Sequence, residues 1–266
     1  MESLRIFLLA ALFLVVFGAN NGSTETGPVA HWSFDEEDGT IAYDSSENDH
    51  NGALENGPVW VDGVSNGALE FDGTDDYIEV SDNDSLDLGT GSFTIASWVN
   101  VADCSDNCQI VKKGHNNKIE LEINNYIAKG VVTGNDYVES SFSFSQSEWY
   151  FLVFIRDETS LKMYVNGDLD STESVESPAN VGNNEDLHIG KDSAYGQYFD
   201  GIIDDVTIWG RALSSEEILE LYTDGGYEES TPDLAEGETE GELWIPSVSL
   251  ISSIAAIGII ALRRRY

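Results

Sequence analysis

Short runs of β-branched and aromatic residues alternate with turns rich in Gly, Asn, Asp and Ser between residues 28 and 225. This pattern predicts strands joined by tight connections, and no long amphipathic helix is predicted before Ser214. We therefore expect one all-β domain over 28–225, in which nine or more antiparallel strands form two packed sheets. The clearest predicted strands are 30–34, 68–71, 77–80, 93–101, 118–123, 126–133, 149–156, 161–165 and 202–209.

Two local patterns refine this prediction. The run WYFLVFIR at 149–156 is apolar at nearly every position, which favours a central strand covered on both faces over an edge strand. Asn166 and Gly167 follow the strand 161–165, and this dipeptide is typical of a type I′ hairpin, because both central positions of that turn require positive φ.

The run 199–222 predicts a strand, a turn and a short helix in succession. Asp204 and Asp205 interrupt an otherwise apolar strand, and buried carboxylates need a compensating partner, of which a cation is the obvious candidate. We expect Asp205 to face solvent. Ser214 and Glu217 have the spacing of a capping box, and the apolar stripe that follows predicts a C-terminal helix packed on the β core.

Both ends of the chain carry targeting patterns. Residues 1–19 have one arginine, an apolar stretch and a small-residue end, which predicts a secretory signal peptide. The Glu- and Gly-rich segment 226–243 is predicted to be a disordered acidic stalk. Residues 244–262 carry no charge and would span roughly 28 Å as a helix, which favours a transmembrane helix over a buried core helix. The basic tail 263–266 is expected in the cytoplasm, so the N-terminal domain would be anchored outside the cell surface.

Charge narrows the choice of partners. The chain has 49 acidic and 12 basic residues, for a formal net charge of −37. Such a surface repels nucleic acid, so we expect no nucleic-acid partner. The acidity has two readings that remain open: adaptation to salty surroundings, in which screening removes the repulsion, and a direct use in function.

Two cysteines and two sequons complete the local motifs. Cys104 and Cys108 enclose three residues of an exported chain, which predicts a local disulfide that pins one loop. Two cysteines alone make a poor zinc site. Asn21 and Asn83 lie in NGS and NDS and are candidate N-glycan acceptors.

With these elements in order, the chain resembles the laminin-G-like jellyroll family, also called concanavalin A-like lectin/glucanase domains. The resemblance implies an antiparallel jellyroll sandwich whose first and last strands are neighbours. It is carried by AHWSFDEEDG (30–39), DSSENDHNGAL (44–54), GALEFDGTDDYIEV (67–80), SFTIASWVNV (92–101), LKMYVNGDL (161–169), LHIGKD (187–192) and FDGIIDDVTIWGRALSSEEILELY (199–222).

The C-terminal tail separately resembles the sorting tails of some archaea and bacteria, which combine a short Pro-containing signal, a hydrophobic segment and arginines. Here the signal would be 245–247, although the Pro-Gly-Phe form of the archaeal version is missing. Whether the tail is cut is left open by this difference.

The family resemblance also implies a structural calcium ion. In the family, the aspartate after the first strand and the first acid of the last strand commonly meet at such an ion, and these positions are Asp35 and Asp204 here. Asn51 and Gly52 would add loop carbonyl oxygens, which suit a cation that takes six to eight oxygen ligands. The alternative is that Asp35 caps a turn and Asp204 faces solvent at a sheet edge. A second acidic group, Asp72, Asp75 and Asp76, is expected to accept turn hydrogen bonds instead of binding a ligand.

Catalysis is not expected. Glucanases of this fold use Glu-x-Asp-x-x-Glu on one strand, and the nearest segment here, 120–125, lacks the third acid. The four histidines have no ligand spacing, and no Ser-His-Asp set is evident from the sequence.

Aromatic residues offer the remaining candidate chemistry, because their faces stack on sugar rings. Trp32, Trp98 and Trp149 lie in predicted strands and are expected in the core. Candidates for ligand contact are the loop and strand-end aromatics Trp60, Tyr126, Tyr137, Tyr195 and Tyr198. The sequence thus predicts a non-catalytic, calcium-stabilised binding or adhesion module for a carbohydrate or a cell-surface protein. A structural coat or spacer protein is the alternative, and a glycoside hydrolase is a more distant one.

Overall fold

The computed structural model describes residues 27–133, 136–192 and 194–225. The predicted signal peptide, stalk, membrane span and basic tail lie outside these residues. Within the described part, no helix has the length and hydrophobicity needed to cross a membrane.

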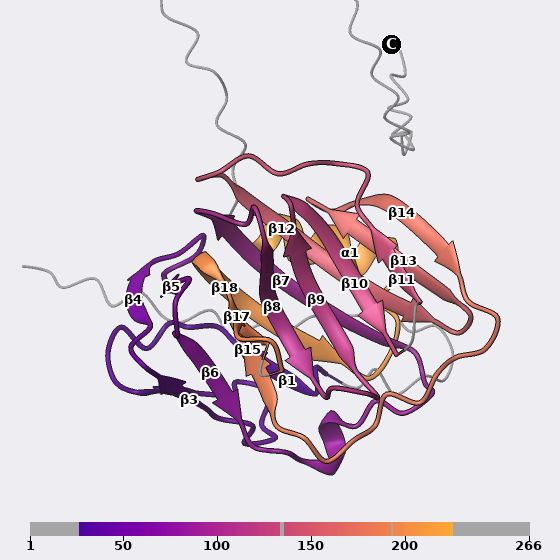
Figure 1. The fold of residues 1–266 in the computed structure, drawn as a ribbon, viewed down its shortest axis with the longest axis horizontal. Coiled ribbons are helices and arrows are strands. Elements are labelled where there is room, and N and C mark those ends of the chain that lie inside the picture. Colours follow the sequence, from indigo (N-terminus) through magenta and orange to yellow (C-terminus); the bar gives the residue numbers. More distant parts are fainter. Residues whose placement is uncertain (1–26, 134–135, 193, 226–266) are drawn as a thin grey trace, which may run out of the picture. The chain divides into compact units, whose positions relative to one another are not determined.

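Two antiparallel sheets of eight strands each form the domain (Figure 1). Sheet I has the order β14-β13-β12-β7-β18-β5-β4, with β1 paired to β18, and sheet II has the order β11-β10-β9-β8-β15-β6-β3-β2. Sheet I contains β1 (Ala30–Trp32), β4 (Val59–Asp62), β5 (Gly67–Asp72), β7 (Phe93–Val101), β12 (Trp149–Asp157), β13 (Ser160–Val165), β14 (Asp168–Ser174) and β18 (Asp200–Trp209). Sheet II contains β2 (Ile41–Ala42), β3 (Gly52–Glu55), β6 (Tyr77–Val80), β8 (Asn107–Lys113), β9 (Ile119–Asn124), β10 (Ile127–Val132), β11 (Tyr137–Glu139) and β15 (Leu187–Ile189).

Three smaller elements complete the fold. They are the hairpin of β16 (Lys191–Asp192) and β17 (Gln197–Tyr198), the short 3-10 helix η1 (Asp84–Leu86), and the helix α1 (Ser215–Asp224). All nine predicted strands are confirmed, and the prediction of a two-sheet sandwich with one short helix is confirmed as well. The first and last strands are neighbours, since Ala30 pairs with Ile208.

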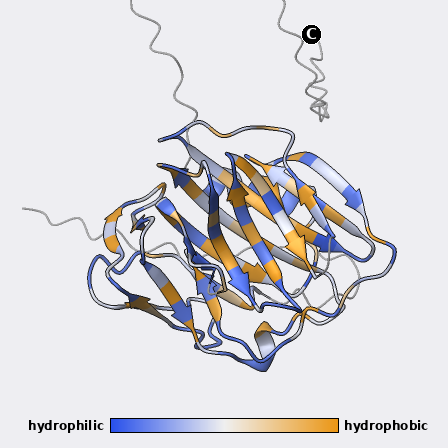
Figure 2. Ribbon diagram, in the orientation of Figure 1, coloured by the Kyte–Doolittle hydropathy of each residue, from blue (hydrophilic) through white to orange (hydrophobic). Residues whose placement is uncertain are grey.

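The main core lies between the two sheets. Strands of sheet II alternate between hydrophobic and hydrophilic positions, as Figure 2 shows for the strands at the front of the view. In β9, Ile119, Leu121 and Ile123 belong to the core cluster, so Glu120 and Glu122 project from the opposite face. The sheets approach closely at Gly130 of β10, where a Cβ would overlap the ring of Phe154.

Sheet I is also covered on its other face. β12 pairs with β7 and β13, and its residues alternate between the intersheet core (Leu152, Phe154) and a second cluster that includes Phe151. That second cluster contains Ile218 of α1, which is completely buried, so the helix packs on sheet I. The predicted central strand is therefore confirmed.

The local signals at turns and caps are also confirmed. Ser214 accepts a hydrogen bond from the Glu217 backbone N–H, and the Glu217 side chain accepts one from the Ser214 N–H, which completes the capping box. Asn166 and Gly167 both have positive φ, at 51° and 83°, between β13 and β14.

The last strand changes neighbours halfway along its length. β18 pairs with β5 through residues 200–203 and with β1 through Val206–Ile208. Between these two segments the register shifts, and Asp205 has a φ of 49°. Asp204 lies at this bulge, between the segment of β18 that pairs with β5 and the segment that pairs with β1. Its side chain is completely buried.

Candidate functional site

A cavity of about 390 Å³ lies on the outer face of sheet II. The hairpin β16–β17 packs beside β8 and forms one side of it. Because of this cover, outward-facing polar residues that a bare sheet would expose are buried. The lining residues come from β8 to β11 and from the hairpin: Asn107, Lys118, Glu120, Glu122, Lys129, Val131, Tyr137, Asp192, Tyr195 and Gln197.

Buried ion pairs form one part of the cavity floor. The Lys112 ammonium lies 2.6 Å from Glu120 Oε1 and 2.5 Å from Asp192 Oδ2, and all three residues are almost completely buried. Lys118 holds the second oxygen, Glu120 Oε2, at 2.7 Å. Burial lowers the pKa of Lys112, but the two carboxylates outweigh it and the net shift is upward. Both oxygens of Glu120 are therefore occupied by ammonium groups.

Glu122 is the second carboxyl of the floor, and its surroundings differ. Its Oε2 accepts a hydrogen bond of 2.8 Å from Asn107 Nδ2, and among the described residues no lysine forms an ion pair with it. Burial raises the pKa of Glu122, while the Asn107 hydrogen bond opposes the rise and the charge of Glu120 adds to it. The cavity is thus lined by two carboxylates in ion pairs, Glu120 and Asp192, and by Glu122, whose pKa is raised.

Asn107 contributes a hydrogen-bond acceptor that is not satisfied within the protein. Its Nδ2 donates to Glu122 and, at 3.0 Å, to Gln197 Oε1, whereas its buried Oδ1 has no hydrogen-bond partner. A buried polar atom without a partner costs free energy, and a ligand hydroxyl or N–H group would relieve this cost.

Two tyrosines stand at the sides of the cavity. Tyr137 is 42% exposed and lies under the Lys129 ammonium, 4.2 Å from the ring centroid. Tyr195, at the tip of the hairpin, is 69% exposed and lies near the ring of His115. Exposed aromatic faces beside hydrogen-bonding groups are a combination suited to sugar rings, which have apolar faces and a hydroxylated rim.

The other predicted aromatics are placed elsewhere. Tyr198 lines a neighbouring cavity of about 500 Å³, and Trp60 lines a separate one of about 630 Å³ together with Asp35. The indole N–H of Trp60 donates to the Gly39 carbonyl. Of the five candidates, the structure thus brings together Tyr137 and Tyr195. Trp32 and Trp98 lie in the core as predicted, whereas Trp149 is half-buried.

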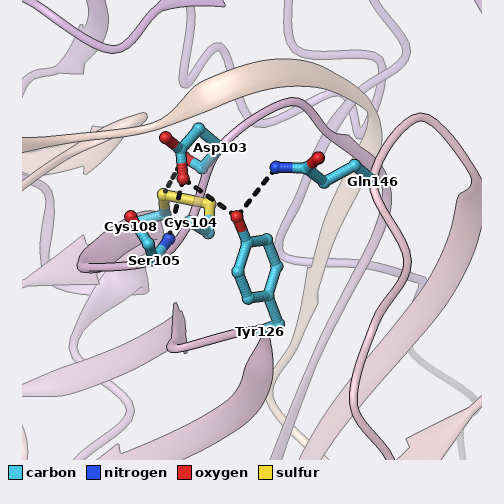
Figure 3. Close-up of a disulfide and its surroundings, with 6 residues drawn as sticks. All are labelled: Asp103, Cys104, Ser105, Cys108, Tyr126 and Gln146. Carbon is cyan, nitrogen blue, oxygen red and sulfur yellow. Dashed lines mark hydrogen bonds between the residues drawn. A yellow bond between two sulfur atoms is a disulfide. The ribbon is translucent and has the colours of Figure 1, made fainter.

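The predicted disulfide is confirmed, and Figure 3 shows its surroundings. Cys104 and Cys108 are bonded, with their Cα atoms 5.5 Å apart. The Tyr126 hydroxyl donates to Asp103 at 3.0 Å and accepts from Gln146 at 2.8 Å, so this tyrosine supports the disulfide loop through its hydroxyl group.

Asp35 and Asp204, the predicted calcium ligands, both contact the loop between β4 and β5. Asp35 Oδ1 accepts from the Gly67 N–H at 3.0 Å, and Asp204 Oδ2 accepts from the Val64 N–H at 2.9 Å. A Cβ on Gly63 would overlap both Asp204 Oδ2 and the Gly67 carbonyl oxygen, so this glycine allows them to approach. The complete burial of Asp204 excludes the alternative in which it faces solvent.

The surroundings of the Asp204 carboxylate fit those of a cation ligand. Its Oδ1 is buried without a hydrogen-bond partner. Burial raises the pKa of Asp204 to about 8, with a further contribution from the charge of Asp205, against the lowering effect of backbone hydrogen bonds. A buried carboxylate that lacks a compensating partner fits a bound cation. Asp205, expected to face solvent, is instead half-buried, because the bulge turns it toward His31 Nε2 at 3.0 Å.

The loop 44–52, in contrast, is organised around Asp44. The Asp44 carboxylate accepts backbone hydrogen bonds from His31, Ser46 and His50. Asn51 uses its side-chain oxygen to accept from the Asp44 N–H, and Gly52 begins β3. In the described part of the chain, no hydrogen bond or ion pair links Asn51 or Gly52 to Asp35 or Asp204.

Asp44 and His50 of this loop form, with Ser85 of η1, a Ser-His-Asp set that the sequence did not reveal. His50 Nε2 lies 2.5 Å from Ser85 Oγ, but His50 Nδ1 bonds to the Asn48 carbonyl at 2.8 Å and lies 3.7 Å from Asp44 Oδ2. The carboxylate is already occupied by backbone donors, so it does not orient the imidazole through a hydrogen bond, as a catalytic triad requires. We interpret the set as a clamp that joins this loop to η1.

The acidic group at Asp72, Asp75 and Asp76 has the turn role expected for it. Asp72 Oδ1 accepts from the Thr74 and Asp75 N–H groups, and Asp76 Oδ2 accepts from the Asp72 N–H. Its carboxylate oxygens lie within 4.8 Å of one another, but two of the three side chains are exposed, and the hydrogen bonds account for the arrangement.

The sandwich topology, with a polar cavity on the outer face of one sheet, defines a lectin-like β-sandwich. Residues 72–219 match the family model described as the concanavalin A-like lectin/glucanases superfamily. The chain belongs to this superfamily. No curated protein matches the chain.

Several solved structures share the fold. The binding domain of Paraclostridial Mosquitocidal Protein 1 has a TM-score of 0.64 and 18% identity, over 74% of this chain and 52% of that one. Domain 4 of an extracellular arabinanase from Geobacillus stearothermophilus, in complex with arabinotriose, has a TM-score of 0.61 and 20% identity, over 73% and 98%. The binding domain of botulinum neurotoxin serotype G has a TM-score of 0.60 and 15% identity, over 74% and 51%. The chain spans about half the length of the two toxin domains.

Proposed function

We propose that this protein is a non-catalytic carbohydrate-binding module displayed on the cell surface. The observation that carries the proposal is the cavity between Tyr137 and Tyr195, which combines two exposed aromatic faces with a preformed polar floor. Two neighbours are described as binding domains, and a third, a domain of an arabinanase, is in complex with arabinotriose, which supports a binding role for a domain of this fold.

The ionic contacts of the floor favour binding over glycoside hydrolysis. Hydrolysis of a glycosidic bond needs two carboxyl groups, one as acid and one as base or nucleophile. Both oxygens of Glu120 are paired with ammonium groups, which leaves Glu122 as the one carboxyl of this strand open to a ligand. The next outward position on β9 is Asn124, which has no acid function.

The size and polarity of the cavity favour a sugar over a protein surface. Its volume falls within the range of about 300–1,000 Å³ that is typical of small-molecule sites. Protein interfaces instead centre on contiguous apolar patches. Among the described residues, the exposed large hydrophobic side chains are few and come from several separate elements, such as Ile41 of β2, Leu169 of β14 and Leu219 of α1.

We also propose a structural calcium ion held by Asp204 and Asp35, as the family resemblance implies, with loop carbonyl oxygens completing its ligands. Asn51 and Gly52 stay proposed donors, and the Gly67 carbonyl oxygen, which lies beside Asp204 Oδ2 at Gly63, is a further one. A divalent cation would supply the positive charge that compensates the buried Asp204 carboxylate. Export by the signal peptide and anchoring by 244–262 complete the proposal.

A glycan array tests the binding function. The full-length protein should bind a restricted set of glycans, and Tyr195→Ala should weaken this binding. Tyr43→Ala is the matched control, because Tyr43 is 55% exposed and does not line the cavity. A chelator should weaken binding only as far as it destabilises the fold. If no glycan on the array is bound, the proposal is contradicted, and a structural coat or spacer protein becomes the favoured interpretation.

A further inference from the structure

A second cavity adjoins the first at the hairpin β16–β17. It has a volume of about 500 Å³ and shares Asn107 and Gln197 with the Tyr137 cavity. Its other lining residues come mainly from the disulfide loop, the end of β9, the hairpin β16–β17 and the start of β18. They include Asp103, Ser105, Asp106, Asn124, Tyr198 and Asp200.

The boundary between the two cavities is a fixed side chain. Asn107 donates to Glu122 on one side and to Gln197 on the other, at 2.8 and 3.0 Å, so its amide plane is held in place. Its Oδ1 is buried and has no partner. A ligand that crosses from one cavity to the other would pass this acceptor and satisfy it with a hydroxyl group.

We propose that the two cavities are adjoining subsites of one groove, which binds a glycan chain across Asn107 instead of a single terminal sugar. This inference rests on the proposed carbohydrate-binding function and deepens it. Each cavity lies within the volume range of about 300–1,000 Å³ for small-molecule sites, so together they accommodate a longer ligand than either would alone.

The charges of the two subsites differ, and this restricts the chain. In the Tyr137 cavity the carboxylates are offset by Lys118 and Lys129. The second cavity contains three aspartates, Asp103, Asp106 and Asp200, and none of its described lining residues is basic. A carboxylated sugar unit would meet like charge there, with a cost in binding free energy. The groove therefore fits an uncharged glycan chain and excludes polyuronates.

A length series tests this inference. The full-length protein is titrated with arabino-, xylo- and cello-oligosaccharides of two to six units, and with oligogalacturonides of the same lengths. Affinity should rise with length in one neutral series until both cavities are filled, whereas oligogalacturonides of every length should bind more weakly. Asn107→Ala should lower affinity for the long chain about tenfold, the equivalent of one hydrogen bond to a buried group.

Two further variants separate the subsites. Tyr198→Ala, in the second cavity, should weaken binding of the longest chain and leave the disaccharide unaffected, whereas Tyr137→Ala should weaken both. Asn184→Ala is the control, because Asn184 is exposed and lines neither cavity. Thermal unfolding of each variant checks that it is folded.

The outcomes distinguish the inference from the function on which it rests. Equal affinity for two and six units, or tighter binding of oligogalacturonides, would overturn the groove and leave the single-site carbohydrate function standing. Absence of binding to all four series, together with a silent glycan array, would overturn both.

Discussion

Glu122 and Asp204 are two buried carboxyl groups whose pKa values are raised, and in both cases burial is the main cause. Their settings differ, because Glu122 borders a cavity open to ligands, whereas Asp204 is enclosed at the bulge of β18. Burial thus affects two carboxyl groups for which we propose different roles. Glu122 forms hydrogen bonds with a sugar, and Asp204 is one ligand of a structural cation.

The pKa of Glu122 predicts a pH-dependent cost to stability. A raised pKa means that the folded state holds the proton more tightly than the unfolded state. The contribution of Glu122 to stability is therefore greatest below the ordinary glutamate pKa of 4.5 and falls as the pH rises from there through the folded-state pKa. Glu122→Gln keeps an acceptor for Asn107 and removes the charge. In thermal unfolding, this variant should be more stable than the wild type at pH 7, and the difference should disappear toward pH 4. A variant less stable at pH 7 would contradict the assigned shift.

The proposed calcium ion predicts a gain in stability that depends on Asp204. A ligand that binds only the folded state stabilises it by about 2.7 kcal/mol at a free concentration of 100 Kd. Calcium should therefore raise the Tm of the chelator-treated wild type and leave that of Asp204→Asn unchanged. Asp75→Asn, in the exposed acidic turn, is the control and should respond like the wild type. If instead Asp75→Asn loses the response, calcium binds at that turn and the assignment to Asp204 is wrong.

At the scale of elements, the hairpin β16–β17 has the largest effect on the site. β9 alternates apolar and polar residues, which by itself predicts a solvated outer face. The hairpin packs beside β8 and brings Asp192 to Lys112, which is why Glu120 and Glu122 are buried. A flat polar sheet face thereby becomes a cavity with two tyrosines at its sides.

The capping box of α1 predicts a measurable contribution to the fold. Ser214→Ala removes the acceptor for the Glu217 N–H and should cost about 1 kcal/mol. For a domain of about 150–250 residues this corresponds to a fall in Tm of about 2–4 °C. Glu220→Gln, on the exposed side of the helix, should change Tm by less than the experimental error. A Ser214→Ala variant as stable as the wild type would mean that packing of Ile218 alone holds the helix.

The elements that the sequence predicts are those with long, regular apolar patterns. β7 and β6 agree with their predicted ranges at both ends, because alternation and flanking turns define them. β14 was not predicted, since it consists largely of Asp, Ser, Thr and Glu and is an edge strand with mostly exposed residues. β16 and β17 have two residues each, too few for any periodic pattern.

The site was predictable only in part, for a related reason. Tyr137 and Tyr195 were identified as exposed aromatics, but their convergence depends on contacts between distant parts of the chain. Lys112 and Asp192 are eighty residues apart in sequence, and Asn107 begins β8 between two cysteines that are the visible motif of this segment. The unusual setting of Asp204 was indicated because two acids in an apolar strand conflict with burial, a local signal that needs no tertiary information.

On the scale of the whole molecule, the balance of charges around the cavity differs from that of the rest of the protein. The chain has a net charge of −37, yet Lys112 and Lys118 pair with carboxylates of this cavity, and Lys129 lines it as well. The strongly negative field that repels anions elsewhere is thus offset locally. This local balance is consistent with an uncharged ligand.

The most direct test of this account is a calorimetric titration of the full-length protein with the strongest glycan found on the array. The wild type and Tyr43→Ala should bind one equivalent with the same affinity. Tyr137→Ala and Tyr195→Ala should each lose at least about 0.5–1.5 kcal/mol of binding free energy, by analogy with pairs of aromatic side chains. If the Tyr137→Ala/Tyr195→Ala double variant stays folded and binds the glycan as tightly as the wild type, the ligand binds elsewhere and the central claim is contradicted.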